Sequence, residues 1–304
     1  MNNFYSPLRY PGGKNRLAPF IAKICLDNSL TQRYIEPYSG GGSVALFLLL
    51  EGIVDDIVIN DKDRSIYAFW HSILNHTTTF CNMIQKCDVS IEEWKRQKAI
   101  QTIKNKVSLL DLAFSTFFLN RTNRSGIING GVIGGLSQNG NYLLDCRFNK
   151  DELISRIHTI ASKRKHIRIY KKDAISLINI LYNRKLISQD SLIYFDPPYY
   201  TKGPSLYMNH YSSRDHENVR DAISSISQCK WIISYDPTNE IQTLYSSFRK
   251  LEYELIHYAH TSKRGAEILF FSDNIRMIDF SRNPSLYKII TNDQSQKKII
   301  YGGE

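Results

Sequence analysis

Residues 191–199 read Ser-Leu-Ile-Tyr-Phe-Asp-Pro-Pro-Tyr, and the fold is best predicted outward from them. Leu192 to Phe195 is a short run of large apolar residues, the pattern of a strand buried on both faces. The two prolines after Asp196 remove two backbone donors and hold the chain extended, so the strand ends there. A carboxylate, a fixed carbonyl and an aromatic ring are left at the carboxyl end of a strand, where open α/β sheets place their ligands.

The residue types after this strand suit a flat base that carries an exocyclic amino group. The carboxylate of Asp196 and the carbonyl of Pro197 can each accept one amino hydrogen, Pro198 keeps the segment rigid, and the ring of Tyr199 can stack on the base. A strand followed by a rigid turn without a chemical role is the alternative. Taken alone, this short motif leaves both interpretations open.

Length and composition restrict the class of protein. The 304 residues suffice for one large domain or a domain with a sizeable insertion, and the formal net charge of +10 favours a polyanionic partner. The cysteines are scattered without a Cys-x-x-Cys pair, and no two histidines have metal-binding helical spacing, so we expect neither disulfides nor a metal site. The N-terminus lacks a signal-peptide pattern and the longest apolar run, Val44 to Leu50, is too short to span a bilayer. We therefore expect a cytoplasmic protein that does not contact membranes.

A glycine turn and a spaced acid predict nucleoside binding. Residues 34–43 read as a strand through Glu36, a turn that contains Gly40 and Gly42, and the start of a buried helix. Glycines here let a ligand lie against bare backbone at a helix N-terminus. The next predicted strand, 56–60, is followed by Asp61, about twenty residues beyond the glycines, where such units place a ribose-binding carboxylate.

Two further segments belong to the predicted site. Tyr10-Pro-Gly-Gly-Lys14 is a tight turn before a helix, and it presents one aromatic ring and one cation. Asp173 follows a third predicted strand, 166–170, where it lies beside a cofactor, caps the next helix, or does both.

Residues 120–135 change the character of the chain, because they are glycine-dense and contain two arginines and three asparagines. The segment is too polar for a core and too patterned for a disordered linker, so we predict loops or a hairpin on an inserted unit. Arginine reads guanine and asparagine reads adenine in the major groove, although the same side chains also satisfy glycine-rich turns. Candidate DNA contacts from this segment and from the aromatic loop after Tyr199 are Asn120, Arg121, Asn123, Arg124, Tyr207 and Tyr211.

Repeated strand–helix units predict an open α/β sheet, and two consecutive final strands, ending with 267–271, predict an antiparallel hairpin at its edge. Together the motifs resemble those of the Dam-like (alpha-group) N6-adenine-specific DNA methyltransferases, in that family's order, from Ser6 to about Asp273. The resemblance implies a Rossmann-like, mostly parallel seven-stranded sheet. It also implies a catalytic domain of residues 1–75 and 150–304 and an inserted, mainly helical target-recognition domain of residues 76–149.

The resemblance further implies an activity: methyl transfer from S-adenosyl-L-methionine to the N6 amino group of a flipped adenine in double-stranded DNA, without a metal. Asp196 to Tyr199 would hold the base, and the cofactor would be bound by Tyr10, Lys14, Glu36, Gly40, Gly42, Asp61, Asp173 and Asp196. Such enzymes serve restriction–modification, with a cognate endonuclease acting separately, or act as orphan or phage methylases. We expect a monomer encoded by a bacterium or phage.

One segment departs from the family's pattern. Residues 122–128 differ in character from the matching segment of members that read GATC, so the resemblance does not extend to a recognition sequence. An N4-cytosine DNA methyltransferase, an adenine RNA methyltransferase, and a catalytically silent DNA-binding module on the same fold are the alternatives.

Overall fold

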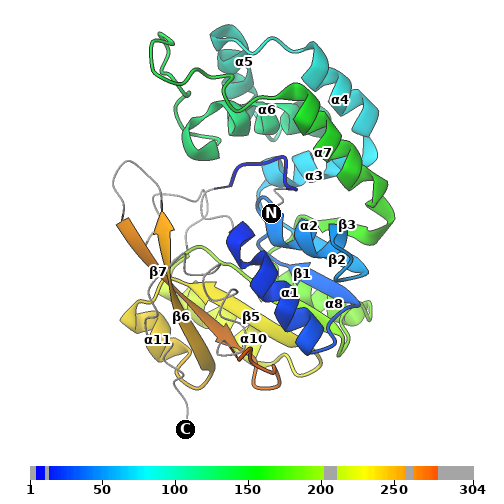
Figure 1. The fold of residues 1–304 in the computed structure, drawn as a ribbon, viewed down its shortest axis with the longest axis vertical. Helices are drawn as coiled ribbons and strands as arrows, with labels where there is room; N and C mark the ends of the chain where they lie inside the picture. Colours follow the sequence, from blue (N-terminus) through cyan, green and yellow to red (C-terminus); the bar gives the residue numbers. More distant parts are fainter. Residues whose placement is uncertain (1–4, 11–13, 202–210, 258–262, 280–304) are drawn as a thin grey trace.

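The computed structural model describes residues 5–10, 14–201, 211–257 and 263–279, and a twisted sheet forms the centre of this part of the chain (Figure 1). The sheet has seven strands in the order β3-β2-β1-β4-β5-β7-β6. Their bounds are β1 Arg33–Glu36, β2 Asp56–Asn60, β3 Ile167–Tyr170, β4 Ser191–Phe195, β5 Lys230–Tyr235, β6 Arg249–His257 and β7 Lys263–Phe271. Strands β1 to β5 pair in parallel, whereas β7 pairs antiparallel with both β5 and β6. The predicted α/β fold with an antiparallel edge hairpin is confirmed.

The order of the strands creates a crevice at one point of the sheet. The chain runs outward from β1 to β2 and β3, then returns so that β4 pairs with the other side of β1. Ligands of open α/β sheets bind outside the carboxyl ends of the strands where the order reverses in this way. The reversal lies between β1 and β4, the two strands that carry Glu36 and the Asp-Pro-Pro-Tyr segment.

Helices cover both faces of the sheet and divide its core in two. Helices α1 (Ala18–Asp27) and α2 (Ser43–Leu50) share one apolar cluster with Tyr34 of β1, and a 3-10 turn, η1 (Lys14–Leu17), precedes α1. Helices α8 (Ala174–Asn183), α10 (Ser213–Ser224) and α11 (Asn239–Leu244) share the other cluster with Ile35, the next residue of β1. Alternate residues of a strand point to opposite faces, and both faces are covered, which explains why β1 and β4 are buried throughout.

A group of helices lies beyond one end of the sheet (Figure 1). It comprises α3 (Arg64–Asn75), α4 (Thr77–Lys86), α5 (Ile91–Thr102), α6 (Leu109–Thr122) and α7 (Lys150–Ser162), with short turns η2 (Arg124–Gly126) and η3 (Arg164–His166). Phenylalanines hold it together: Phe69 of α3 stacks on Phe117 of α6, and Phe148 packs edge-on against Phe117. The inserted helices therefore share their core with α3, which begins before residue 76. No helix of the described residues is long and apolar enough to cross a membrane.

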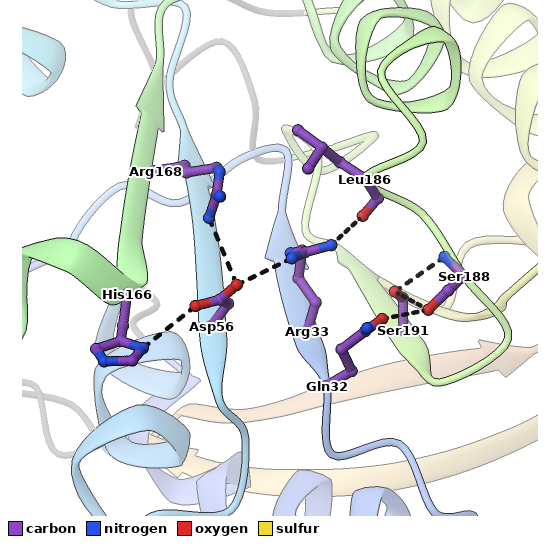
Figure 2. Close-up of polar contacts among 8 residues, drawn as sticks. All are labelled: Gln32, Arg33, Asp56, His166, Arg168, Leu186, Ser188 and Ser191. Atoms are coloured by element: carbon purple, nitrogen blue, oxygen red, sulfur yellow. Dashed lines mark hydrogen bonds and ion pairs between the residues drawn. The ribbon is translucent and has the colours of Figure 1, made fainter.

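The amino ends of the parallel strands are tied together by charge (Figure 2). Asp56 of β2 pairs with Arg33 of β1 at 2.9 Å, with Arg168 of β3 at 3.5 Å and with His166 Nδ1 at 3.3 Å. Arg33 also donates to the carbonyl oxygen of Leu186, in the segment that leads to β4. One carboxylate thus links three neighbouring strands at the edge opposite the crevice.

We predict that Asp56→Ala lowers the free energy of unfolding by about 2–3 kcal/mol, because the guanidinium group of Arg33 remains buried without its counter-charge. Urea denaturation measures this loss. The matched control is Asp190→Ala at an exposed position near the same edge, which should change stability by less than about 0.5 kcal/mol. Equal, small effects of the two substitutions would show that the charge cluster contributes nothing.

Candidate active site

Carboxylates gather at the carboxyl ends of the parallel strands. In the order β1 to β5, they are Glu36, Asp61, Asp173, Asp196 and Asp236. The first four line a single cavity of about 840 Å³, together with Tyr10, Lys14, Gly40 and Gly42. The fifth, Asp236, instead accepts hydrogen bonds from the backbone N–H groups of Tyr200 and Thr201. Every residue predicted to bind the cofactor therefore faces one cavity.

The glycine turn between β1 and α2 requires glycine for two reasons. Gly40 and Gly42 have φ angles of 46° and 56°, in the left-handed region. A Cβ atom on Gly40 would lie 2.6 Å from the ring of Tyr10, and one on Gly42 would lie 3.1 Å from the ring of Trp70. Trp70 also donates from Nε1 to the carbonyl oxygen of Gly40 at 3.1 Å. The turn therefore packs between two aromatic rings, which leave little room for a side chain at either glycine.

Two of the carboxylates ionise only with difficulty. Burial raises the pKa of Asp61 to about 7, although the backbone N–H groups of Asp63 and Gly40 donate to its oxygens at 2.9 and 3.1 Å. Burial likewise raises the pKa of Glu36 to about 8, and the N–H of Ala45 donates to it at 3.2 Å. Acceptors buried in this way suit a ligand that brings hydroxyl and ammonium donors, so these residues fit a nucleoside with an amino-acid end.

The protein contacts Asp196 through one of its two carboxylate oxygens. Ser234 donates to Oδ1 at 2.7 Å and Lys14 Nζ lies 3.2 Å from the same atom. Among the described residues these contacts all fall on Oδ1, and the side chain is 21% exposed. Burial raises the pKa of Asp196, Lys14 opposes the shift and Glu267 adds to it. The second oxygen, Oδ2, remains available to a ligand in the cavity.

The rest of the Asp-Pro-Pro-Tyr segment divides between the cavity and the core. Pro198 lines the cavity, whereas Pro197 is buried. Tyr199 is 7% exposed, lies outside the lining, and places its hydroxyl 2.5 Å from Lys14 Nζ and 2.7 Å from Glu267 Oε1. Stacking of this ring on a base would require it to leave those contacts.

The predicted DNA-binding asparagines hold the polypeptide rather than face solvent. Asn120 accepts from the N–H of Arg9 at 2.7 Å and donates to the carbonyl oxygens of Arg9 and Gly126. Asn123 accepts from Trp94 Nε1 at 2.6 Å and donates to two carbonyl oxygens of its own loop. Both residues are at most 1% exposed. Both amide N–H groups of each asparagine are used in these bonds, so a base contact that needs an amide donor would break one of them.

The other predicted DNA contacts are more accessible. Arg124 is exposed, and Arg121 lines the cavity, where burial and the neighbouring Arg9 and Arg156 lower its pKa to about 10. Tyr211 also lines the cavity, and its hydroxyl lies 3.0 Å from that of Tyr38. Tyr207 lies outside the described residues.

Several residues of the site were not predicted. Trp70, Tyr194, Ser234 and Glu267 reach it from α3, β4, β5 and β7. Their neighbours along the chain are mostly apolar, so the sequence gives little indication of a role for them. The exception is Glu267, because an acid directly before the apolar run Ile268–Phe271 is unusual in a buried strand. Among the described residues, no cluster of three or more histidine, cysteine or acidic side chains is placed to hold a metal ion.

Comparisons with known proteins identify the family of the chain. A model of the D12 class N6 adenine-specific DNA methyltransferases matches residues 10–259. The chain is 22% identical over 206 residues to the Type II methyltransferase M.MjaIII of Methanocaldococcus jannaschii, an alignment that covers 63% of this chain and 68% of the relative.

Among solved structures, the chain matches the rRNA methyltransferase AviRa from Streptomyces viridochromogenes with 10% identity and a TM-score of 0.37, and the match covers 88% of each chain. Protein LPL1258 from Legionella pneumophila str. Philadelphia 1 has 13% identity and a TM-score of 0.35, with 95% of this chain and 98% of that one covered.

The raised pKa of Glu36 predicts a pH-dependent stability of the ligand-free protein. Because the folded pKa, about 8, lies above the usual value of 4.5, the protonated side chain favours folding at low pH, and this stability is lost as the pH rises through about 8. Glu36→Gln should therefore flatten the fall in melting temperature between about pH 4.5 and 8. Calorimetric scans measure the melting temperature at each pH. If its dependence on pH is the same in the variant as in the wild type, Glu36 does not have the raised pKa. The control is Glu217→Gln, at an exposed position of α10, which should leave this dependence unchanged.

Proposed function

Because the chain belongs to the D12 class N6 adenine-specific DNA methyltransferase family, we propose that it moves the methyl group of S-adenosyl-L-methionine to the N6 atom of an adenine rotated out of double-stranded DNA. The observation that supports this most is the position of Asp196. Its carboxylate has one oxygen engaged by the protein and lines the cavity shared with the glycine turn and Asp61.

The cofactor residues form a site with two ends. Glu36 and the backbone of the glycine turn would take the amino-acid end, Asp61 would accept from the ribose hydroxyls, and Asp173 would lie near the cofactor's adenine. When bound, S-adenosyl-L-methionine supplies an electrophilic methyl group on a sulfonium sulfur. Lys14 and Tyr10 border the cavity on the side of the N-terminal segment.

The residues of the site act by orienting the amino group. An adenine amino nitrogen is a weak nucleophile because its lone pair is delocalised into the ring. Asp196 Oδ2 and the carbonyl oxygen of Pro197 would each accept one amino hydrogen and direct the lone pair at the methyl group, which is catalysis by positioning and electrostatics. The nitrogen gains the methyl group and loses one proton, for which Asp196 is the acceptor with a raised pKa.

The inserted unit would bind the duplex. Rotating a nucleotide out of the stack costs a few kcal/mol, and contacts to phosphates and to the flipped base would offset this cost. We assign residues 76–149 as the target-recognition unit, with Arg121, Arg124 and Tyr211 as DNA contacts. Asn120 and Asn123 would serve it indirectly, by fixing the loop that presents Arg124.

The identity of the methylated atom can be tested on defined oligonucleotides. Transfer to adenine in a DNA duplex supports the proposal, whereas transfer to the N4 atom of cytosine or to RNA would replace it with one of the alternatives, because those amino groups also suit two acceptors. Single-molecule sequencing of DNA from cells that express the chain would report the base and its sequence context.

We predict that Asp196→Ala abolishes methyl transfer, with kcat reduced by at least about a thousandfold, because the amino group loses its charged acceptor. Binding of a DNA duplex in a mobility-shift assay should change by less than about threefold, because the phosphate contacts are untouched. Full activity of the variant would refute the role of Asp196.

Asp61→Ala should raise the dissociation constant of S-adenosyl-L-methionine by at least about tenfold, since the ribose hydroxyls lose their acceptor and Gly40 loses a hydrogen bond that fixes the turn. Isothermal calorimetry on the DNA-free protein measures the change. Asp55→Ala provides the control, at an exposed residue just before β2. Equal affinity of both variants would exclude Asp61 from the cofactor site.

A further inference from the structure

One ammonium group is shared between two carboxylates beside the cavity. Lys14 Nζ lies 3.2 Å from Asp196 Oδ1 and 3.3 Å from Glu267 Oε1. The side chains of Lys14 and Glu267 are each 5% exposed. Glu267 comes from β7, a strand of the antiparallel hairpin, and neither the Asp-Pro-Pro-Tyr segment nor the glycine turn contains it.

Glu267 is built into the protein as an ionised group. Its Oε1 atom accepts from Lys14 and from the hydroxyl of Tyr199, and its Oε2 atom accepts from the hydroxyl of Tyr253 on β6. Burial by itself would raise the pKa of Glu267, but Lys14 and the two tyrosine hydroxyls outweigh burial and lower it. Glu267 does not line the cavity, so it can act on a substrate only through its neighbours.

We propose that Glu267 is a positioning residue for methyl transfer: it holds Lys14 between the two carboxylates, so that the ammonium engages only Oδ1 of Asp196 and leaves Oδ2 to the target amino group. This inference rests on the proposed function. Without the charge of Glu267, the ammonium of Lys14 would pair more strongly with Asp196 and withdraw its charge from the amino group.

The charges of Lys14, Asp196 and Glu267, which together form a charge cluster, support this role of Glu267. Lys14 contributes one positive charge, and Asp196 and Glu267 contribute one negative charge each, which leaves one net negative charge next to the cavity. A net negative charge strengthens Asp196 as an acceptor of amino hydrogens. It also favours the positive charge that develops on the amino nitrogen during transfer.

Glu267→Gln tests the proposal because glutamine keeps the volume of the side chain and removes its charge. We expect kcat to fall by about tenfold, while the KM values for DNA and cofactor stay within about twofold, because no binding contact is lost. The acid limb of the kcat–pH profile should move to lower pH, since the charge of Glu267 raises the pKa of Asp196. The other groups whose charges or hydrogen bonds act on Asp196 are unchanged in the variant: Lys14, Glu36, Tyr194, Tyr199, Ser234 and Tyr253.

The matched control lies on the same hairpin. Glu252 of β6 immediately precedes Tyr253, is exposed, and pairs with Lys250 at 3.0 Å. Glu252→Gln removes the same charge from the opposite face of the strand. It should leave kcat and the pH profile as in the wild type. A shift as large as that of Glu267→Gln would mean that the effect is not specific to the cluster.

Variants that also lack Lys14 distinguish a positioning role of Glu267 from a merely structural one. In Lys14→Met, two buried carboxylates face each other without a counter-charge, so Asp196 is driven to its protonated form. Adding Glu267→Gln to Lys14→Met should therefore raise kcat, although the same substitution lowers it in the wild type. A further loss in the double variant would overturn the proposal.

Cofactor binding gives a readout that does not depend on turnover. Calorimetry of S-adenosyl-L-methionine binding to the DNA-free protein at pH 6, in buffers of different ionisation enthalpy, counts the protons released. We expect fewer protons from Glu267→Gln than from the wild type or Glu252→Gln, because Asp196 already binds its proton less tightly. Equal proton release, together with an unchanged kcat, would reduce Glu267 to a structural residue. A wild-type protein that binds the cofactor but methylates no adenine would refute the proposed function and leave this comparison valid.

Discussion

The pairing of five strands in parallel is the constraint on which the rest of the molecule depends. Parallel strands bring all their carboxyl ends to one edge, and in this chain each of these ends carries an acid. Acids on neighbouring strand ends repel one another and are costly to bury. They are retained at an edge that gathers four of them around one cavity. The amino edge shows the contrast, because there a single carboxylate, Asp56, faces two guanidinium groups and an imidazole ring (Figure 2).

The positions of Asp61, Asp196 and the glycine turn could be predicted because each directly follows a strand in the chain. Asp61 and Asp196 follow apolar strands directly, and the turn at Gly40 stands between a strand and a buried helix, so local pattern placed all three at the same edge. The antiparallel hairpin could be predicted because the last two strands follow one another in the sequence without a helix between them. The packing of helix α4 (Thr77–Lys86) depends mainly on α7, which lies far along the chain, so the sequence around α4 does not indicate its main partner.

Residues whose roles depend on distant partners could not be predicted in this way. Asn120 has the side chain of a base reader, but it bonds to Arg9, 111 positions away. Tyr199 has the ring of a stacking residue, and its hydroxyl bonds to Glu267, 68 positions away. Glu267 itself is an acid in an apolar strand, and nothing near it in sequence indicates Lys14 as its partner. In each case the residue type was informative, whereas the contact depends on the packing of the whole sheet.

The N-terminal segment explains how the helical group and the cavity are held in register. The hydroxyl of Ser6 donates to the carbonyl oxygen of Gly41 in the glycine turn at 2.6 Å. The side chain of Asn120 accepts from the N–H of Arg9 and donates to the carbonyl oxygen of the same residue. Five residues after Arg9, Lys14 reaches Asp196. Residues of one N-terminal segment therefore contact the glycine turn, the end of α6 and the carboxylate of Asp196. Because these contacts are made by backbone groups and buried side chains, Ser6 and Arg9 tie the glycine turn to the end of α6.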